Sequence, residues 1–138
     1  ALWLDSLLPV IEAGLLETVD VAARPRVGGR IAFVPTPGHS PDHAALILAA
    51  GDDYACFSGD LLHSPLQFAH PQWNSAFCGD PRQAEASRRE MMAWGASHHA
   101  QWFTGHFAGS SCGWLEEDKQ GDYRWREAGQ QAADKGKQ

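Results

Sequence analysis

The sequence predicts an α/β fold built as one domain. Residues 2–16 carry apolar residues at helical spacing, Asp80 and Pro81 give the start signal of a second helix, and several short apolar segments between turn residues indicate strands. The length of 138 residues is enough for one domain to bury a core of its own. Hydrophobic residues make up 43% and charged residues 20% of the chain, which is ordinary for a globular protein.

The first helix should be interrupted near its middle. Pro9 lies inside the helical pattern, so we expect a break near Leu8, with a helix that starts afresh there and ends at Gly14. The composition of residues 18–22 predicts a short strand, and the alternation over residues 30–34 predicts a second one.

The middle of the chain is predicted to form a hairpin between two loops. Three prolines and a glycine within residues 35–43 exclude regular structure and indicate a rigid loop. The apolar run 44–50 predicts a buried strand, and a Gly-Asp-Asp turn leads to its returning partner at 54–58. Residues 63–80 should form a long loop, and loops of this length are often functional.

The second helix begins at a clear signal. Asp80 is a typical N-cap and Pro81 suits the first helical position, so the helix should run from there to its end at Gly95. A strand is then expected over residues 101–104.

A hairpin is expected to close the domain, with its strands at 113–117 and 122–126. The domain should span residues 1–127. The remaining residues, 128–138, are polar and are predicted to be a disordered tail.

Charge and cysteine content exclude several classes of partner. The net charge is −6 and no basic stripe is present, so neither nucleic acid nor an anionic membrane is expected, and the partner should be a small-molecule substrate. No apolar stretch reaches the length of a membrane helix, and the first residues do not resemble a signal peptide. Three cysteines without CxxC spacing suggest reduced thiols and a cytoplasmic protein.

Three short segments share one design: a strand, then a glycine, then a potential metal ligand. The ligands are His39, Asp60 and His106. Glycine permits a tight exit from the strand and a close approach of the backbone to an ion. Imidazole and carboxylate suit Zn²⁺, and also Mn²⁺, Co²⁺ or Fe²⁺. Because a carboxylate has two oxygens, Asp60 is the natural bridge between two ions.

Each segment taken alone has a plainer interpretation. A histidine in a Pro/Gly loop is more often structural than a ligand, and a Gly-Asp pair after a strand is usually a turn or a helix cap. The spacing alone leaves the metal and structural interpretations at even odds. The combination of the three segments, in this order and each after a strand, favours metal binding.

The motifs resemble those of the metallo-β-lactamase superfamily. TPGHSPDH (36–43) resembles the family's TPGHTPGH, FSGDLLH (57–63) resembles the segment of the bridging aspartate, and TGHF (104–107) resembles the late histidine segment. The loop PLQFAHPQWN (65–74) and the closing hairpin (113–128) are most similar to the branch of methyl-parathion hydrolases and lactonases.

The resemblance implies a fold, a cofactor and an activity. The fold is the C-terminal αβ half of an αββα sandwich, a mixed sheet with flanking helices. The cofactor is a pair of divalent ions, zinc above all, with Asp60 bridging them and with His39 and His106 on different ions. The activity is that of a metal-dependent hydrolase in which a metal-bound hydroxide attacks an ester, lactone or phosphoester.

One part of the family's pattern is absent from the sequence. The His-x-His-x-Asp-His motif, which supplies four ligands in the family, does not occur among the 138 residues. We therefore expect hydrolysis from a longer parent protein and inactivity from this chain alone. The alternative is a truncated, non-catalytic domain that folds by self-association as a homodimer.

Other histidines near these motifs are expected to assist. His43 should brace the loop and orient a ligand, since ligating groups need hydrogen-bonded partners. His63 follows Asp60 by three residues and is the candidate catalytic residue, through contact with substrate or as a proton shuttle. The plainer interpretation of His63 is an exposed loop histidine.

Aromatic and basic residues complete the expectations. Phe68, Trp73 and Phe77 should form the apolar wall of a substrate pocket, or else only pin the long loop to the body. The second helix carries three arginines that are expected on its exposed face, Arg82, Arg88 and Arg89. Cys112 is expected to be a loop thiol, with a soft metal ligand as the alternative.

Overall fold

The computed structural model describes residues 3–129 of the 138-residue chain. The predicted tail, 128–138, therefore lies almost entirely outside the described residues. Within them, seven strands form one sheet in which the order in space follows the order in the chain. The strands are β1 (Arg26–Val27), β2 (Ile31–Pro35), β3 (Ala44–Ala50), β4 (Asp53–Phe57), β5 (Gln101–Phe103), β6 (Cys112–Glu117) and β7 (Tyr123–Glu127).

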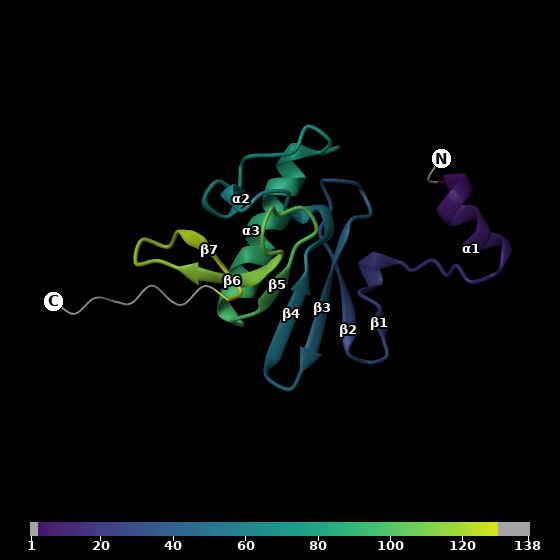
Figure 1. Ribbon diagram of the computed structural model, residues 1–138, viewed down its shortest axis with the longest axis horizontal. Coiled ribbons are helices and arrows are strands. Elements are labelled where there is room, and N and C mark those ends of the chain that lie inside the picture. Colours follow the sequence, from purple (N-terminus) through teal and green to yellow (C-terminus); the bar gives the residue numbers. More distant parts are fainter. Residues whose placement is uncertain (1–2, 130–138) are drawn as a thin grey trace.

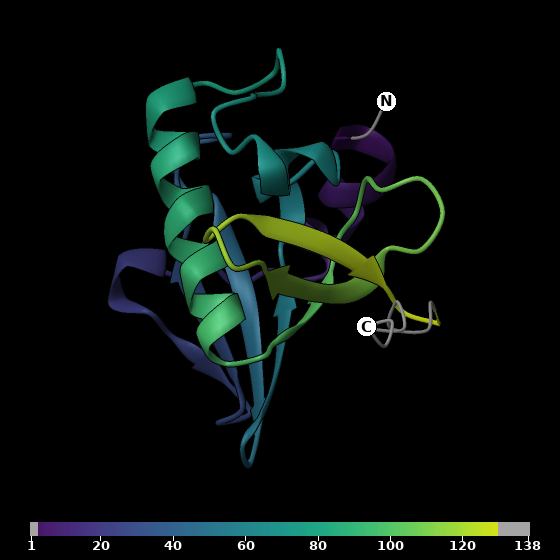
Figure 2. The same ribbon diagram turned by 90° about the vertical axis from the view of Figure 1, so that its left-hand side faces the viewer.

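The sheet is mixed, as predicted. All neighbouring strands are antiparallel except β4 and β5, which pair in parallel with Ala55 opposite Gln101 and Phe57 opposite Phe103. A parallel pair needs a crossover connection, and helix α3 (Pro81–Ser97) provides it. Figures 1 and 2 show α3 lying along one face of the sheet, with the β6–β7 hairpin beside it.

Helix α3 begins where the sequence predicts. The Asp80 side chain accepts hydrogen bonds from the backbone N–H groups of Arg82 and Gln83, both at 3.0 Å, and Pro81 occupies the first turn. These bonds satisfy donors that have no partner inside the helix. The capping signal thus fixes the point at which the long loop ends and the crossover starts.

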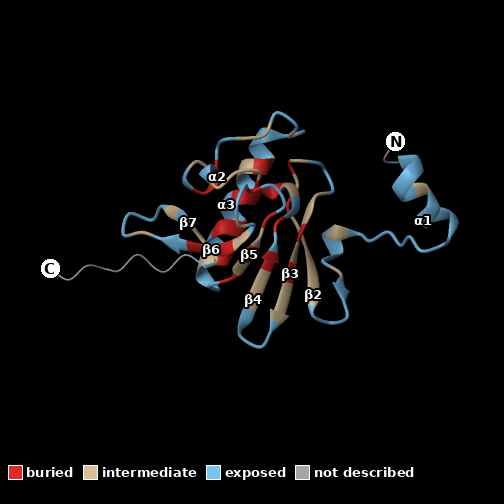
Figure 3. Ribbon diagram, viewed as in Figure 1, coloured by how far each residue is buried: buried red, intermediate tan, exposed pale blue. Residues whose placement is uncertain are grey.

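The core lies between α3 and the sheet, as the buried residues in Figure 3 show. Trp102 on β5 is fully buried and meets Phe68 edge-on, with ring centroids 5.7 Å apart. Met91 and Met92 supply the helix side of the same cluster. The closing hairpin joins through Trp125, whose ring stacks on Phe68 at 5.4 Å.

The predicted end of the second helix at Gly95 is wrong. The helix continues to Ser97, and Gly95 is buried against the Trp102 ring. A Cβ at this position would lie 2.6 Å from the indole, closer than side chains pack. Glycine is therefore present because the tryptophan approaches the helix closely, and not because the helix stops.

Two other short segments also differ from expectation. The predicted strand at 18–22 is absent, and the 3-10 helix Val21–Ala23 lies there instead, capped by the Asp20 carboxylate, which accepts from the Ala22 N–H at 2.9 Å. This local bond favours a turn over an extended strand. The loop 63–80 contains one short helix, α2 (Leu66–Ala69).

The N-terminal segment is broken at Leu8, as predicted. A π-helical turn, Trp3–Leu7, leads into α1 (Leu8–Glu12), with Pro9 in its first turn. None of these residues is buried, and Figure 1 shows α1 held away from the sheet. No helix within residues 3–129 combines the length and apolar character needed to cross a membrane.

Candidate metal centre

The topology brings the three predicted ligand segments to one edge of the sheet. Strands β2 and β4 are each antiparallel to β3 and therefore run in the same direction, and β5 is parallel to β4. The carboxyl ends of β2, β4 and β5 consequently meet at one edge. His39, Asp60 and His106 follow these three ends.

The Asp60 carboxylate lies between the two imidazoles. Its Oδ1 is 2.6 Å from Nε2 of His106, and its Oδ2 is 3.4 Å from Nε2 of His39. The hydrogen bond from His106 holds the pKa of Asp60 below its usual value. Burial opposes this, and the charges of His39, His106 and His63 add to the lowering. Asp60 is therefore an ionised carboxylate that offers one oxygen to each histidine.

His63 joins the same cluster. Its ring stacks on that of His106 with centroids 4.7 Å apart and an interplanar angle of 14°, and it lies 5.1 Å from the ring of His39. Donor atoms of His39, Asp60 and His63 all lie within 4.8 Å of one another. Burial lowers the pKa of His63, and the neighbouring histidines lower it further. His63 is thus a member of the cluster and not a solvated loop residue.

His43 holds the backbone of Asp60. The Asp60 N–H donates to Nε2 of His43 at 2.9 Å, so Nε2 carries no proton and Nδ1 carries it. Nδ1 lies 2.8 Å from Thr36 Oγ1 and 3.1 Å from the Thr36 carbonyl oxygen. Thr36 is buried at the end of the preceding strand. His43 therefore connects the end of β2 to the backbone of Asp60.

Glycine is required at two of the three positions that precede a predicted ligand. Gly38 and Gly59 have positive φ angles of 133° and 51°. A Cβ at Gly59 would lie 2.9 Å from Nε2 of His43 and would displace the hydrogen bond to Asp60. Gly105 has no such angle, and a Cβ there would meet open space. The close approach expected at all three glycines thus holds for the first two only.

Acidification should destabilise the metal-free protein through His43. Burial lowers the pKa of His43 from its usual 6.5, so the unfolded chain binds this proton more readily than the folded one. The stabilisation is present above pH 6.5 and is lost as the pH falls through the lower, folded pKa, because a protonated Nε2 cannot accept from Asp60. His63 shifts in the same direction and adds to the loss.

Urea unfolding of the metal-free chain between pH 7.5 and 5 measures this effect. In His43→Gln the amide cannot titrate, so the unfolding free energy should fall less steeply with pH than in the wild type. His70→Ala is the matched control, because His70 stacks on Trp73 outside the cluster. Equal slopes in His43→Gln and the wild type would contradict the assignment.

Arg88 was predicted on the exposed face of the second helix, and this prediction is wrong. Arg82 and Arg89 are exposed, as expected, but Arg88 is only 1% exposed. Its guanidinium donates to the carbonyl oxygens of Leu61 (3.1 Å) and Pro71 (2.6 Å). Burial lowers the pKa of Arg88.

The spacing of apolar residues in the helix could have predicted that Arg88 is buried. Ala84 and Met91 lie four residues before and three residues after it, and both are buried. Residues at these spacings share one face of a helix. Arg88 therefore lies on the apolar face, and a charge on that face has to find partners inside the protein.

The predicted aromatic wall does not form as one surface. Phe68 is 2% exposed and lies in the core, where it stacks on Trp125, so it pins the loop to the body. Trp73 and Phe77 are 50% and 83% exposed. They remain candidates for substrate contact on the long loop.

The loop is fixed by a buried glutamine that the sequence did not indicate. Gln67 Oε1 accepts from the backbone N–H of His63 at 2.6 Å and of Ser64 at 3.2 Å, while Nε2 donates to the Trp73 carbonyl oxygen at 2.8 Å. One side chain thereby sets the backbone on both sides of α2. This contact places His63 beside the cluster.

The cysteines occupy different places relative to the cluster. All three are free thiols. Cys112 begins β6 and accepts from Gln101 Nε2 at 3.1 Å, and it is not among the grouped donors. Cys78 lies closer, with its Sγ 4.0 Å from Nδ1 of His39.

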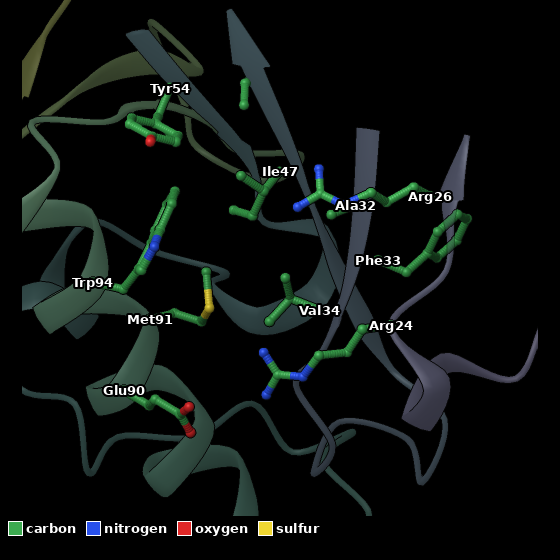
Figure 4. Close-up of a pocket in the computed structure, with 11 residues that line it drawn as sticks. Arg24, Arg26, Ala32, Phe33, Val34, Ile47, Tyr54, Glu90, Met91 and Trp94 are labelled. Atoms are coloured by element: carbon green, nitrogen blue, oxygen red, sulfur yellow. The ribbon is translucent and has the colours of Figure 1, made fainter. Parts of the chain in front are cut away.

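A separate cavity of about 270 Å³ lies on the α3 side of the sheet and contains none of the predicted site residues. Trp94 and Met91 of α3 face Val34 and Ile47 of the sheet across it. Arg24 and Arg26 also line the cavity, and their guanidinium groups are visible in Figure 4. The cavity and the histidine cluster are therefore distinct features of the fold.

Solved structures similar to this chain are hydrolases. The dizinc quorum-quenching lactonase AidC is 24% identical, with a TM-score of 0.74. The hydrolase AbOPH of the β-lactamase superfamily is 21% identical, with a TM-score of 0.81. A probable metal-dependent hydrolase from Staphylococcus aureus is 21% identical, with a TM-score of 0.62. No protein-family model matches the sequence, and no curated protein was found to match it.

The similarity covers most of this chain but less than half of the first two structures. It extends over 92% of the present chain and 43% of each of those chains, and over 75% and 38% for the third pair. At these identities the comparison establishes the fold. The mixed α/β sheet described here is thus the same fold as part of the AidC and AbOPH chains.

Proposed function

We propose that this chain carries part of the active site of a metal-dependent hydrolase that cleaves an ester, a lactone or a phosphoester. His39, Asp60 and His106 would hold divalent metal. The observation that carries the proposal is the meeting of these three side chains, from three separate loops, with the Asp60 carboxylate between the two imidazoles.

The donor set fits a divalent cation. Two imidazole Nε2 atoms and one carboxylate suit zinc, with manganese, cobalt or iron as alternatives. Among the described residues the ion pairs of Asp60 are with His39 and His106, and neither lysine nor arginine neutralises it. A carboxylate that keeps its charge beside imidazoles at a sheet edge is suited to bind a cation.

The arrangement also supports a shared role for Asp60. Each carboxylate oxygen faces a different histidine, so the group can contact two ions, with His39 on one side and His106 on the other. Bound divalent ions would supply a water nucleophile of lowered pKa and would polarise the bond to be cleaved. The Asp60 N–H bond to His43 orients the carboxylate, and His63 lies close enough to contact a substrate or move a proton.

Further ligands are needed for a complete two-metal site. The sequence contains no His-x-His-x-Asp-His motif, and the similar structures are more than twice as long as the region matched. We therefore assign the missing ligands to a segment outside these 138 residues. The substrate classes follow from the polarised carbonyl or phosphoryl chemistry of such sites and from the lactonase named among the similar structures.

Replacing Asp60 by alanine should remove both metal binding and hydrolysis. The carboxylate offers one oxygen to each flanking histidine, so its loss removes the acceptor that the two imidazoles share. Metal content by mass spectrometry and turnover of lactone, aryl ester and phosphotriester substrates measure the two effects in the chain joined to the ligand-bearing segment. Asp52→Ala, in the exposed β3–β4 turn, is the control. Turnover that survives in Asp60→Ala would overturn the proposal.

A further inference from the structure

The distances within the cluster separate the histidines into two groups. Around a tetrahedral zinc ion with bonds of about 2.0–2.2 Å, two donor atoms lie roughly 3.4 Å apart. Nε2 of His39 and Oδ2 of Asp60 are 3.4 Å apart, so they already have the spacing of two ligands of one ion. Nε2 of His106 and Oδ1 of Asp60 are 2.6 Å apart, which is a hydrogen bond and is too short for that role.

The third donor beside His39 and Asp60 is His63. Donor atoms of these three residues lie within 4.8 Å of one another, so small side-chain movements would bring all three onto one ion. Two histidines and one carboxylate, with a position left open, form a common arrangement for a single catalytic metal. His106 is outside this group but within hydrogen-bonding distance of Asp60.

His63 is fixed by hydrogen bonding through its backbone, while Nδ1 of its stacked ring is left without a hydrogen bond. The backbone N–H is fixed by the buried Gln67 side chain at 2.6 Å, and the preceding Leu62 is fully buried. The ring nitrogen Nδ1 is buried and has no hydrogen-bond partner among the described residues. An unsatisfied buried nitrogen costs free energy, and coordination at that atom would remove the cost.

We propose that His63 is a metal ligand, and that this chain by itself binds one divalent ion between His39, Asp60 and His63. In this chain by itself His106 donates to Asp60 and does not contact that ion, which leaves His106 free to hold the second ion of the proposed two-metal site. The inference uses the same cluster as the proposed function, but it requires neither a substrate nor further ligands. It changes His63 from a residue near the substrate into part of the metal site.

Metal titration of the purified 138-residue chain tests the proposal directly. The chain is stripped with a chelator and titrated with Co²⁺, and the visible absorption of tetrahedral cobalt and the heat of binding are both recorded. We expect one ion per chain. His63→Ala should weaken binding by more than about 100-fold, since even the loss of an outer partner of a ligand costs 10–100-fold. His106→Ala should weaken it by less than about 10-fold and keep one ion per chain.

Two further variants keep the result interpretable. His63→Phe retains a ring that can stack on His106 but offers no donor, so it should lose cobalt as His63→Ala does while the far-UV circular dichroism stays that of the wild type. His70→Ala is the matched histidine control, because His70 stacks on Trp73, and it should bind as the wild type.

The failure of this proposal can be told apart from failure of the proposed hydrolase function. Unchanged cobalt affinity in both folded His63 variants, or a loss confined to His106→Ala, would overturn the role of His63 and leave the hydrolase intact. Tight binding of one ion that depends on His63 supports the inference even if the longer protein hydrolyses nothing. Absence of hydrolysis in the longer protein would count against the hydrolase function alone.

Discussion

Replacing Arg88 by leucine should destabilise the metal-free protein by about 3 kcal/mol. The guanidinium donates to the carbonyl oxygens of Leu61, Pro71 and Trp73 and to Asn74 Oδ1, so one side chain joins the segment after Asp60 to the long loop. Leucine fills the volume but leaves these acceptors without a donor inside the protein. Lysine should restore little, because its single ammonium cannot reach acceptors that lie in several directions.

Chemical denaturation measured in a chelator isolates this effect from metal binding. Arg89→Leu is the matched control, since Arg89 is exposed and, within residues 3–129, forms an ion pair with Glu85 one turn away, at 2.8 Å. That pair contributes less than about 0.5 kcal/mol. If Arg88→Leu and Arg89→Leu unfold at the same urea concentration, the buried network does not stabilise the loop. Cobalt binding of Arg88→Leu is measured separately, without chelator. If the variant is as stable as the wild type but binds cobalt more weakly, Arg88 acts by positioning the backbone that follows Asp60.

Local sequence signals predicted β2 to β7 because those signals are strong and short-range, whereas β1 was not predicted. The strand at 44–50 has the predicted bounds, since an apolar run is closed on both sides by turn residues. The hairpin at the end of the chain follows for the same reason. The three ligand segments could be grouped because each follows a strand, and strands that run in one direction end at one edge of a sheet.

Errors arose where a residue is determined by a contact distant in the sequence. Gly95 has the local features of a helix end, yet it is set by Trp102 on a neighbouring strand. Arg88 is a charged residue of the kind usually found on an exposed helix face, yet its hydrogen-bond partners include the loop that precedes the helix. His63 was expected near Asp60 from its spacing, but the bond from its backbone N–H to the Gln67 side chain was not indicated by that spacing.

The glycines show the same distinction between local and tertiary requirements. Gly51 and Gly38 both have positive φ angles, of 67° and 133°. Gly51 lies in an exposed hairpin turn, where the angle alone demands glycine. Gly38 faces the first turn of α3, where a Cβ would overlap the backbone N and Cα of Ala84. Substituting Gly51 therefore tests backbone strain alone, whereas substituting Gly38 tests strain together with steric overlap.

Gly38→Ala should cost about 4 kcal/mol, which is enough to unfold much of a marginally stable domain. The overlap cannot be relieved cheaply, because the Gly38 carbonyl accepts from the Asp80 N–H at 2.8 Å and the Ser87 hydroxyl donates to the Pro37 carbonyl at 2.7 Å. Moving the helix away would break both bonds and displace the neighbouring His39.

Gly51→Ala, with open space around its Cβ, should cost only about 1–2 kcal/mol and should leave cobalt binding unchanged. Urea unfolding of the two variants side by side, with far-UV circular dichroism to detect outright unfolding of Gly38→Ala, measures the difference. Equal losses would mean that the first ligand loop is not packed against the start of α3. In that case the position of His39 would have to come from its own loop, because the crossover helix could not fix it.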